Sequence, residues 1–340
     1  MRLRGSGRLI LVAVLVVVLG GYSAFWFIVA GQIENGIGEW AESLRPHNVD
    51  LSWRTIGVGG FPLSFRAEAR DVLLRDPALT EPAEVRVPRL SADAQPWNLR
   101  QWRLAAPEGL AATLGPPEKP TTKLAARAAT GMVAPAADGG ARVQIGLDDA
   151  AVDSGVRVAA RQVELSLSLP QHPPQSADER AIAVALAVRD LTVPAVPAPL
   201  RNPFDEIAIA AALMGPVPTA PPRQAATAWR DAGGILELER VALRWGTLVV
   251  TGSGTMALDT ELQPIGAFSA AIEGYDELLS ALVGAGRVRS NDAGLARMAL
   301  GFLAKPGPGG RPQIAAPFTI QDGQMLLGPV KLGPAPRIPW

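Results

Sequence analysis

The longest apolar run of the chain extends from Leu9 to Ala30 and contains no charged residue and no proline. At about 1.5 Å per helical residue it reaches about 33 Å, enough to cross a hydrocarbon core of about 30 Å. The pattern predicts a transmembrane anchor over 9–30. A cleaved signal peptide is the alternative, but the run exceeds the usual h-region of about 7–15 residues and its end, Phe27 to Val29, lacks the small residues of a cleavage site.

Charge around this run predicts the orientation of the anchor. Residues 1–8 carry three arginines and no acid, whereas the first charge after the run is Glu34. Positive flanking segments remain cytoplasmic. We therefore expect a single-pass protein of a bacterial inner membrane, with a cytoplasmic N-terminus and the bulk of the chain in the periplasm.

Apolar residues continue at helical spacing after the run, at Ile33, Ile37, Trp40 and Leu44. This spacing predicts a juxtamembrane helix over 31–46, which Pro46 ends. We expect the helix to pack against its own domain. The alternative is an interfacial helix that lies on the membrane surface.

The hydrophobic period then changes to two. Alternation around 49–54 and 63–68 predicts a hairpin with its bend at 57–62, and a third strand is expected over 83–94. The clearest strand is 156–169, in which Val163, Leu165, Leu167 and Leu169 point to one side and polar residues to the other. Such alternation is typical of an antiparallel sheet with one packed face.

The neighbouring segment 181–193 is apolar on both sides. Ile182, Val184 and Leu186 alternate with alanines. Small apolar residues on the second side favour a covering element, which could be a helix or a ligand.

Four helices are expected in the second half of the chain. Asn202 and Pro203 suit the start of a short helix over 204–215. A second, over 223–232, is expected to end at Gly233. Two more are expected within 275–304. Strands are predicted within 235–272 and over 314–320 and 325–332, whereas 115–140 reads as a surface excursion with a short alanine-rich segment.

Together these elements predict an α+β fold: a transmembrane helix, then twisted, curved antiparallel sheet with a few short helices packed on it. The expected organisation is an N-terminal β-rich lobe (47–193), a proline-rich linker with short helices (194–234) and a C-terminal β-rich lobe with two helices (235–340). Trp97 and Trp102 fall in the first lobe, where they could touch lipid or lie at the edge of the core.

Composition limits the chemistry. The chain has no cysteine, two histidines and zero formal net charge. No motif for zinc, phosphate loops, dinucleotides or nucleophilic serine is present, and the glycines at 252 and 254 lie in a strand pattern, where glycine marks a bulge or a close backbone approach. We expect no cofactor, no metal site, no nucleic-acid partner and no enzymatic activity.

Four segments carry a resemblance to a known family: GGFPLSF (59–65), WRDAGG (229–234), the run 242–268 and DGQMLLGPVKLGPAP (322–336). They resemble an alphaproteobacterial family known as domain of unknown function 2125. That family is distantly similar to AsmA-like proteins of the inner membrane, and this similarity implies curved sheets that bind or convey lipid acyl chains. The chain is far shorter than the long AsmA relatives, which argues against a bridge between two membranes.

The resulting hypothesis is a non-enzymatic protein of the cell envelope that holds an apolar ligand or lipid in a groove of the sheet. The alternative is a periplasmic scaffold or assembly factor that contacts envelope proteins through its sheet edges or its loops at 60–62 and 306–310. Each candidate groove residue also suits ordinary core packing. The candidates are Trp53, Phe61, Phe65, Ile182, Val184, Leu186, Trp245, Leu248, Phe268 and Phe302.

Overall fold

A computed structural model describes most of the chain, in two compact units formed by residues 1–133 (unit 1) and 134–340 (unit 2). Side chains are described from residue 17 onward, except at 299, 302, 303, 316, 327, 330 and 332. The described backbone covers 4–77, 81–194, 202–286, 288–307, 311–328 and 330–338.

Unit 1 begins with one uninterrupted helix, α1 (Arg4–Leu44), which contains both the predicted anchor and the predicted juxtamembrane helix. The helix is long and apolar enough to span a membrane. A 3-10 turn at Arg45–His47 follows it, as expected from Pro46. Ala30 and Ala41 are buried against the sheet, and Ile33 packs nearby, so the stalk contacts its own domain as predicted. Trp40, expected on the same stripe, is 57% exposed.

The sheet of unit 1 is built around β3, which pairs with β1, β2 and β4, all antiparallel. One end of β4 pairs with β5 and the other with β6; β6 also pairs with β7, and β5 with β8. The strands are β1 (Asp50–Ser52), β2 (Thr55–Gly59), β3 (Phe65–Asp76), β4 (Ala83–Gln95), β5 (Asn98–Ala106), β6 (Leu110–Leu114), β7 (Thr122–Ala126) and β8 (Ala128–Pro135).

Alternation along β3 decides which side of this sheet meets α1. Phe65 and Ala67 are buried, whereas Arg66 between them is exposed. Phe65 packs with Trp26 and Ala30 of α1 in a small core. A hairpin occurs here, but its first strand differs from the prediction: β2, which includes part of the expected bend, pairs with β3 across a bend at 60–64. The segment expected to pair with 63–68 instead forms β1, which pairs with residues 73–75 at the other end of β3.

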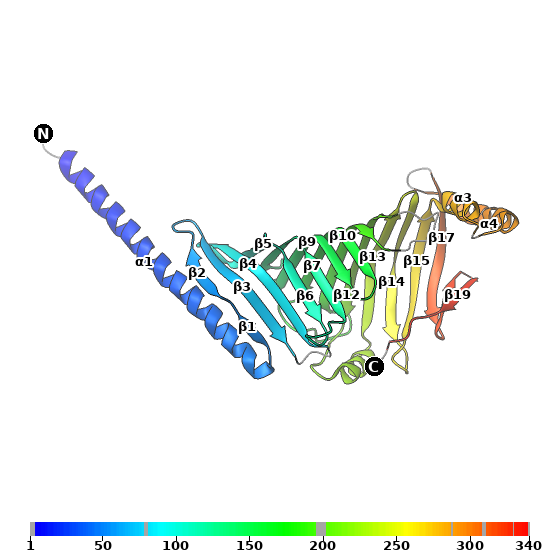
Figure 1. The fold of residues 1–340 in the computed structure, drawn as a ribbon, viewed down its shortest axis with the longest axis horizontal. Helices are drawn as coiled ribbons and strands as arrows, with labels where there is room; N and C mark the ends of the chain where they lie inside the picture. Colours follow the sequence, from blue (N-terminus) through cyan, green and yellow to red (C-terminus); the bar gives the residue numbers. More distant parts are fainter. Residues whose placement is uncertain are drawn as a thin grey trace. The chain divides into compact units, whose positions relative to one another are not determined.

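Unit 2 is a long antiparallel meander in which consecutive strands pair from β9 to β15, followed by β17, β18 and β19. Its labelled strands run side by side in Figure 1. The strands are β9 (Ala141–Asp153), β10 (Arg157–Leu169), β11 (Arg180–Thr192), β12 (Phe204–Met214), β13 (Ile235–Trp245), β14 (Leu248–Leu258), β15 (Pro264–Glu273), β16 (Ala304–Pro306), β17 (Pro312–Gln321), β18 (Gln324–Leu327) and β19 (Val330–Pro334).

Three short helices interrupt this meander: α2 (Pro222–Asp231), α3 (Tyr275–Gly284) and α4 (Ser290–Leu303). All three were expected. α3 contacts β14 and α4 contacts β17, so these two helices pack on the sheet. α2 meets the end of β12, where the Trp229 indole N–H donates to the Met214 carbonyl at 2.7 Å.

The prediction of a helix over 204–215 is wrong, because this segment forms strand β12. Its alanines have high helix propensity, but Ile207, Ile209 and Leu213 also alternate with smaller residues. Pairing with β11 on one side and β13 on the other satisfies the whole backbone, and this outweighs local propensity.

The segment 115–140 is also more regular than expected, because β7 and β8 lie within it. Its alanine-rich part forms strand rather than helix. The division between the units likewise falls at 133/134 rather than in the proline-rich region 194–234, since β11 and β12 pair across that region. Residues 195–201 of that region, and 308–310 of the loop at 306–310, lie outside the described residues.

The glycines of β14 behave as the sequence predicts. A Cβ at Gly254 would lie 2.6 Å from the Phe268 Cα on β15, so the two backbones approach too closely for a side chain. The expected bulge also occurs on β13, where the register with β14 shifts between Leu238 and Val241.

Candidate functional site

The register of unit 2 places large apolar side chains on one continuous face of the sheet. Directly paired residues of antiparallel strands share a face, and one such row runs from Leu165 through Leu186 and Ile209 to Val241. Parallel rows lie on both sides of it. We call this the apolar face; it comprises Val143, Ile145, Leu147, Val163, Leu165, Leu167, Ile182, Val184, Leu186, Val188, Ile207, Ile209, Leu213, Leu236, Leu238, Val241, Leu243, Trp245, Leu248, Val250, Phe268, Ile272, Ile314 and Phe318.

The opposite face of the same strands is polar or lined by alanine. Its most charged row runs from Gln162 through Arg189 and Glu206 to Arg244. Arg189 donates to the Gln162 side chain at 3.0 Å, and Arg244 lies 3.8 Å from Glu206. The alanines that alternate with Ile182 and Leu186 belong to this polar face, so the large apolar groups of β11 lie on the other one. Farther along the sheet, Val249 and Ile265 are apolar residues on the polar face.

Few side chains of the apolar face are buried. Among the described strand residues of unit 2, Ile314 is the one leucine, isoleucine, valine, methionine or phenylalanine that is buried. Ile209 and Ile145 are 37% and 38% exposed. A second layer would bury such residues almost completely. The central strands therefore present a half-exposed apolar surface.

Six candidate groove residues lie on this face. Ile182, Val184 and Leu186 come from β11, and Phe268 from β15. Trp245 and Leu248 pair at the end of the β13–β14 hairpin. They line a cavity of about 410 Å³ together with Leu278 of α3.

The other candidates fall elsewhere. Phe61 and Phe65 lie in unit 1 against α1. Trp53 is half-buried between β1 and β2. Phe302 belongs to α4, and its side chain lies outside the described residues. The structure therefore separates the ten residues between the two units.

An aromatic cluster between α1 and the β2–β3 hairpin was not expected. The Trp26 ring stacks on Phe65 with centroids 5.2 Å apart, and Phe27 stacks on Phe61 at 5.7 Å. The Tyr22 hydroxyl donates to the Pro62 carbonyl. The signal in the sequence is the gathering of aromatic residues at the end of the apolar run.

Charged groups form pairs on the surface of the sheets. The Arg66 guanidinium donates to Asp93 at 2.5 Å, and this hydrogen bond raises the pKa of Arg66. Hydrogen bonds from Arg75 and Arg86 lower the pKa of Glu84. Within the described part of the chain, no three potential metal ligands lie together.

Comparison with known proteins identifies a family. The family model described as "uncharacterized protein conserved in bacteria (DUF2125)" matches residues 26–336. The chain belongs to this family. The match begins at Trp26, within the aromatic cluster, and includes both units; the family description names no activity. No curated protein and no solved structure matches the chain.

Proposed function

We propose that this DUF2125 protein is a non-enzymatic envelope protein, anchored by α1 in a bacterial inner membrane, that holds lipid acyl chains against the apolar face of unit 2. The observation that carries the proposal is the half-exposed apolar face. It continues over β9–β15, while the opposite face of these strands carries mostly polar residues and alanine.

The energetics favour an apolar ligand of extended shape. Covering apolar surface contributes about 25 cal/mol per Å², so a chain that covered roughly 300 Å² would gain about 7 kcal/mol before its losses in entropy. A row such as Leu165, Leu186 and Ile209 crosses neighbouring strands about 4.8 Å apart. Acyl chains are linear and apolar, and they can follow such a row.

Anchoring by α1 would tether unit 2 to a membrane, which is a source of lipid. Three arginines precede the apolar run, and the next basic residue is Arg45, which supports a cytoplasmic N-terminus and a periplasmic bulk. Since the chain has no cysteine, Lys119→Cys and Gly5→Cys test this directly with a membrane-impermeant maleimide. In intact spheroplasts we expect labelling of the first and protection of the second; the reverse pattern would refute the orientation.

The lipid itself is tested by photo-crosslinking. The full chain is reconstituted into liposomes that contain a phospholipid with a diazirine near the end of one acyl chain, irradiated, digested and analysed by mass spectrometry. We expect adducts on Leu186 and Ile209 of the apolar face. Ala185 and Ala210 provide the matched comparison, because they are paired on the opposite face of the same strands.

A variant pair controls for folding. Leu186→Thr with Ile209→Thr places β-branched threonine, which suits strands, at both positions but makes the face polar, and adducts there should fall strongly. Ala185→Thr with Ala210→Thr should leave them unchanged. Adducts confined to α1 would contradict the lipid ligand and favour a scaffold that contacts proteins. The AsmA-like transport of acyl chains rests on the distant resemblance and stays a prediction.

A further inference from the structure

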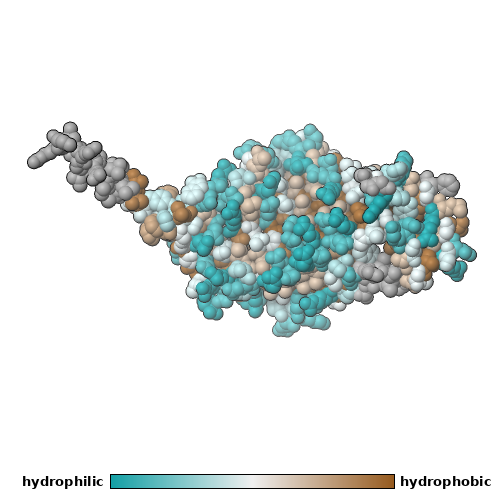
Figure 2. All heavy atoms as spheres, turned by 90° about the horizontal axis from the view of Figure 1, so that it is seen from above, coloured by the Kyte–Doolittle hydropathy of each residue, from teal (hydrophilic) through white to brown (hydrophobic). Residues whose placement is uncertain are grey.

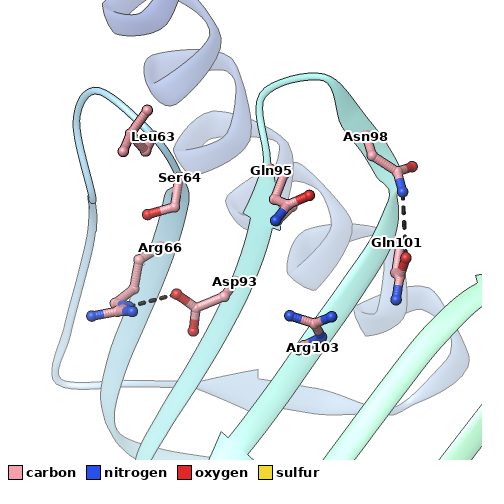
Figure 3. Close-up of a pocket in the computed structure, with 9 residues that line it drawn as sticks. Leu63, Ser64, Arg66, Asp93, Gln95, Asn98, Gln101 and Arg103 are labelled. Carbon is pink, nitrogen blue, oxygen red and sulfur yellow. Dashed lines mark hydrogen bonds and ion pairs between the residues drawn. The ribbon is translucent and has the colours of Figure 1, made fainter.

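Two loop tips of unit 1 carry exposed apolar residues at the same end of the sheet. Phe65 pairs with Ala94 and Gln95 with Asn98, so the β2–β3 tip (60–64) and the β4–β5 turn (96–97) are neighbours. Leu63 and Trp97 are each 68% exposed, and Phe61 is 47% exposed. Figure 3 shows both tips beside α1, which passes behind the strands. We call this end the apolar tip.

The apolar tip lies against the part of α1 that a membrane would enclose. Phe61 contacts Tyr22, Trp26 and Phe27. Just before Tyr22, Val17, Val18 and Leu19 are all more than half exposed. Brown, hydrophobic residues cover this part of the helix next to the grey atoms in Figure 2.

The length of α1 before Tyr22 decides how deep the apolar tip would lie in the membrane. From Leu9 to Gly21 there are 13 apolar or glycine residues, which reach about 20 Å, some 10 Å less than a hydrocarbon core. A helix that spans the membrane must therefore continue inside it to about residue 28. The residues that contact Phe61 then lie within the bilayer, and the tip has to enter with them.

A polar pocket lies just behind the apolar tip, on the face of β3–β5 opposite α1 (Figure 3). Its volume is about 350 Å³, and its lining includes Arg66, Asp93, Gln95, Gln101 and Arg103. Asp93 is opposite Arg66 on β3 and opposite Arg103 on β5. The two arginines and the one aspartate that line the pocket give it a net charge of +1. Arg103 forms no ion pair with any residue that the structure describes.

The pocket stands at the depth of phospholipid headgroups. Leu63 lies in the turn three residues before Arg66, so at most about 10 Å of chain separates the two residues. If Leu63 lies at the edge of the hydrocarbon, the arginines reach the phosphate layer. Trp97 fits this arrangement, because tryptophan concentrates at membrane interfaces.

We propose that the apolar tip is immersed in the membrane beside α1 and that the pocket behind it binds the phosphate of a phospholipid headgroup through Arg103. This site is separate from the apolar face, although it rests on the proposed membrane anchorage. Phe61 and Leu63 would contact the acyl chains, while Arg66, already paired with Asp93, would hold the shape of the pocket.

Depth is tested with single spin labels in the full chain, reconstituted into liposomes of phosphatidylglycerol and phosphatidylcholine. Leu63→Cys and Trp97→Cys report on the tip. Ile28→Cys, 62% exposed on α1, is the lipid reference. Lys119→Cys is the water reference, since its loop adjoins the other end of β4, about 40 Å from the tip.

We expect labels at 63 and 97 to lose access to an aqueous nickel chelate and gain access to oxygen, as at position 28. If they behave like the label at 119 while position 28 is in lipid, the tip is not immersed and this inference fails, although the anchorage stands. If position 28 is also in water, the anchorage itself fails.

Headgroup binding is tested by native mass spectrometry of the same chain released from nanodiscs of the same two lipids. Arg103→Gln should lose one retained phospholipid relative to the natural chain. Arg100→Gln removes the same charge from the same strand but does not line the pocket, and it should retain the lipid. Equal retention in all three chains would overturn the headgroup site.

Discussion

The indole of Trp26 lies parallel to the ring of Phe65, with an angle of 15° between the planes, and its N–H donates to the Ser64 carbonyl at 3.1 Å. These contacts join a helix residue to a hairpin 38 positions later in the chain. The small core around them also includes Ala30 and Val58. The first sheet is thereby fixed directly to the anchor.

Trp26→Ala should release the hairpin from α1. Truncating a buried tryptophan costs about 3–5 kcal/mol because both packing and a hydrogen bond are lost. We expect faster amide hydrogen exchange over 55–70 in the detergent-solubilised chain. Trp40→Ala is the control, because that side chain is 57% exposed; equal acceleration in both variants would contradict the role of Trp26.

Gly36→Ala should stabilise the stalk. A Cβ at Gly36 meets nothing within 4 Å, and alanine is favoured over glycine in a helix by about 1 kcal/mol. Amide exchange over 32–44 should become slower. Gly60→Ala should do the opposite to the hairpin, because Gly60 has φ +98° and a Cβ there would lie 2.7 Å from the Ser64 carbonyl oxygen.

Gly254→Ala should destabilise the centre of unit 2. The added methyl would overlap Phe268 and the Ala267 carbonyl on β15, and such overpacking typically costs about 1–3 kcal/mol. Thermal unfolding of the full chain in detergent measures the loss. Gly57→Ala is the comparison, since that strand glycine has open space and its replacement should be neutral or stabilising.

Gly234→Ala should disturb the end of α2. Gly233 has a left-handed backbone conformation, and its N–H donates to the Arg230 carbonyl. The Gly234 N–H donates to the Trp229 carbonyl, and the two hydrogen bonds together form a Schellman cap. A Cβ at Gly234 would overlap the buried Trp229 indole. We expect a loss of about 1–3 kcal/mol and faster exchange of the α2 amides; no change would show that the indole moves aside freely.

Glu84→Gln should reduce stability at neutral pH and have no effect in acid. Glu84 accepts from Arg75 at 2.8 Å and from Arg86 at 2.5 Å, which lowers its pKa below 4.5. The stabilisation is therefore present above pH 4.5 and is lost as the pH falls through the folded pKa. Exposed pairs contribute about 0.2–1 kcal/mol each.

Thermal melts of the full chain and of Glu84→Gln across the acid range measure this effect. The two melting temperatures should differ near pH 7 and converge once Glu84 is protonated. Glu118→Gln is the matched control, because Glu118 is exposed and forms no ion pair with a residue that the structure describes. A difference that persists in acid would point to packing rather than charge.

Much of the fold could be predicted in segments where apolar residues recur with a single clear period, either that of a strand or that of a helix. The alternation around Val163 and Leu165 defined β10, and Gly233 marked the end of α2. The errors came from segments whose alanines obscure the period. In β12, Ala208 and Ala210 favour helix locally, and pairing with the partners β11 and β13 outweighs this preference.

The candidate site was predictable in part for the same reason. Side-chain alternation indicated that Val184 and Leu186 share a face, and register then joined them to Ile209 and Leu165. Register between strands far apart in sequence is not a local property. The contact of Phe61 with Trp26 likewise depends on where the hairpin returns along α1, which no single segment determines.

Because α1 is one continuous helix, it acts mechanically as a lever. From Trp26 to Leu44 it extends 18 residues, or about 27 Å, along unit 1. A change of about 10° in its tilt within the membrane would displace the far end by about 5 Å. If α1 spans the membrane as proposed, bilayer thickness would therefore set the angle at which the first sheet faces the membrane.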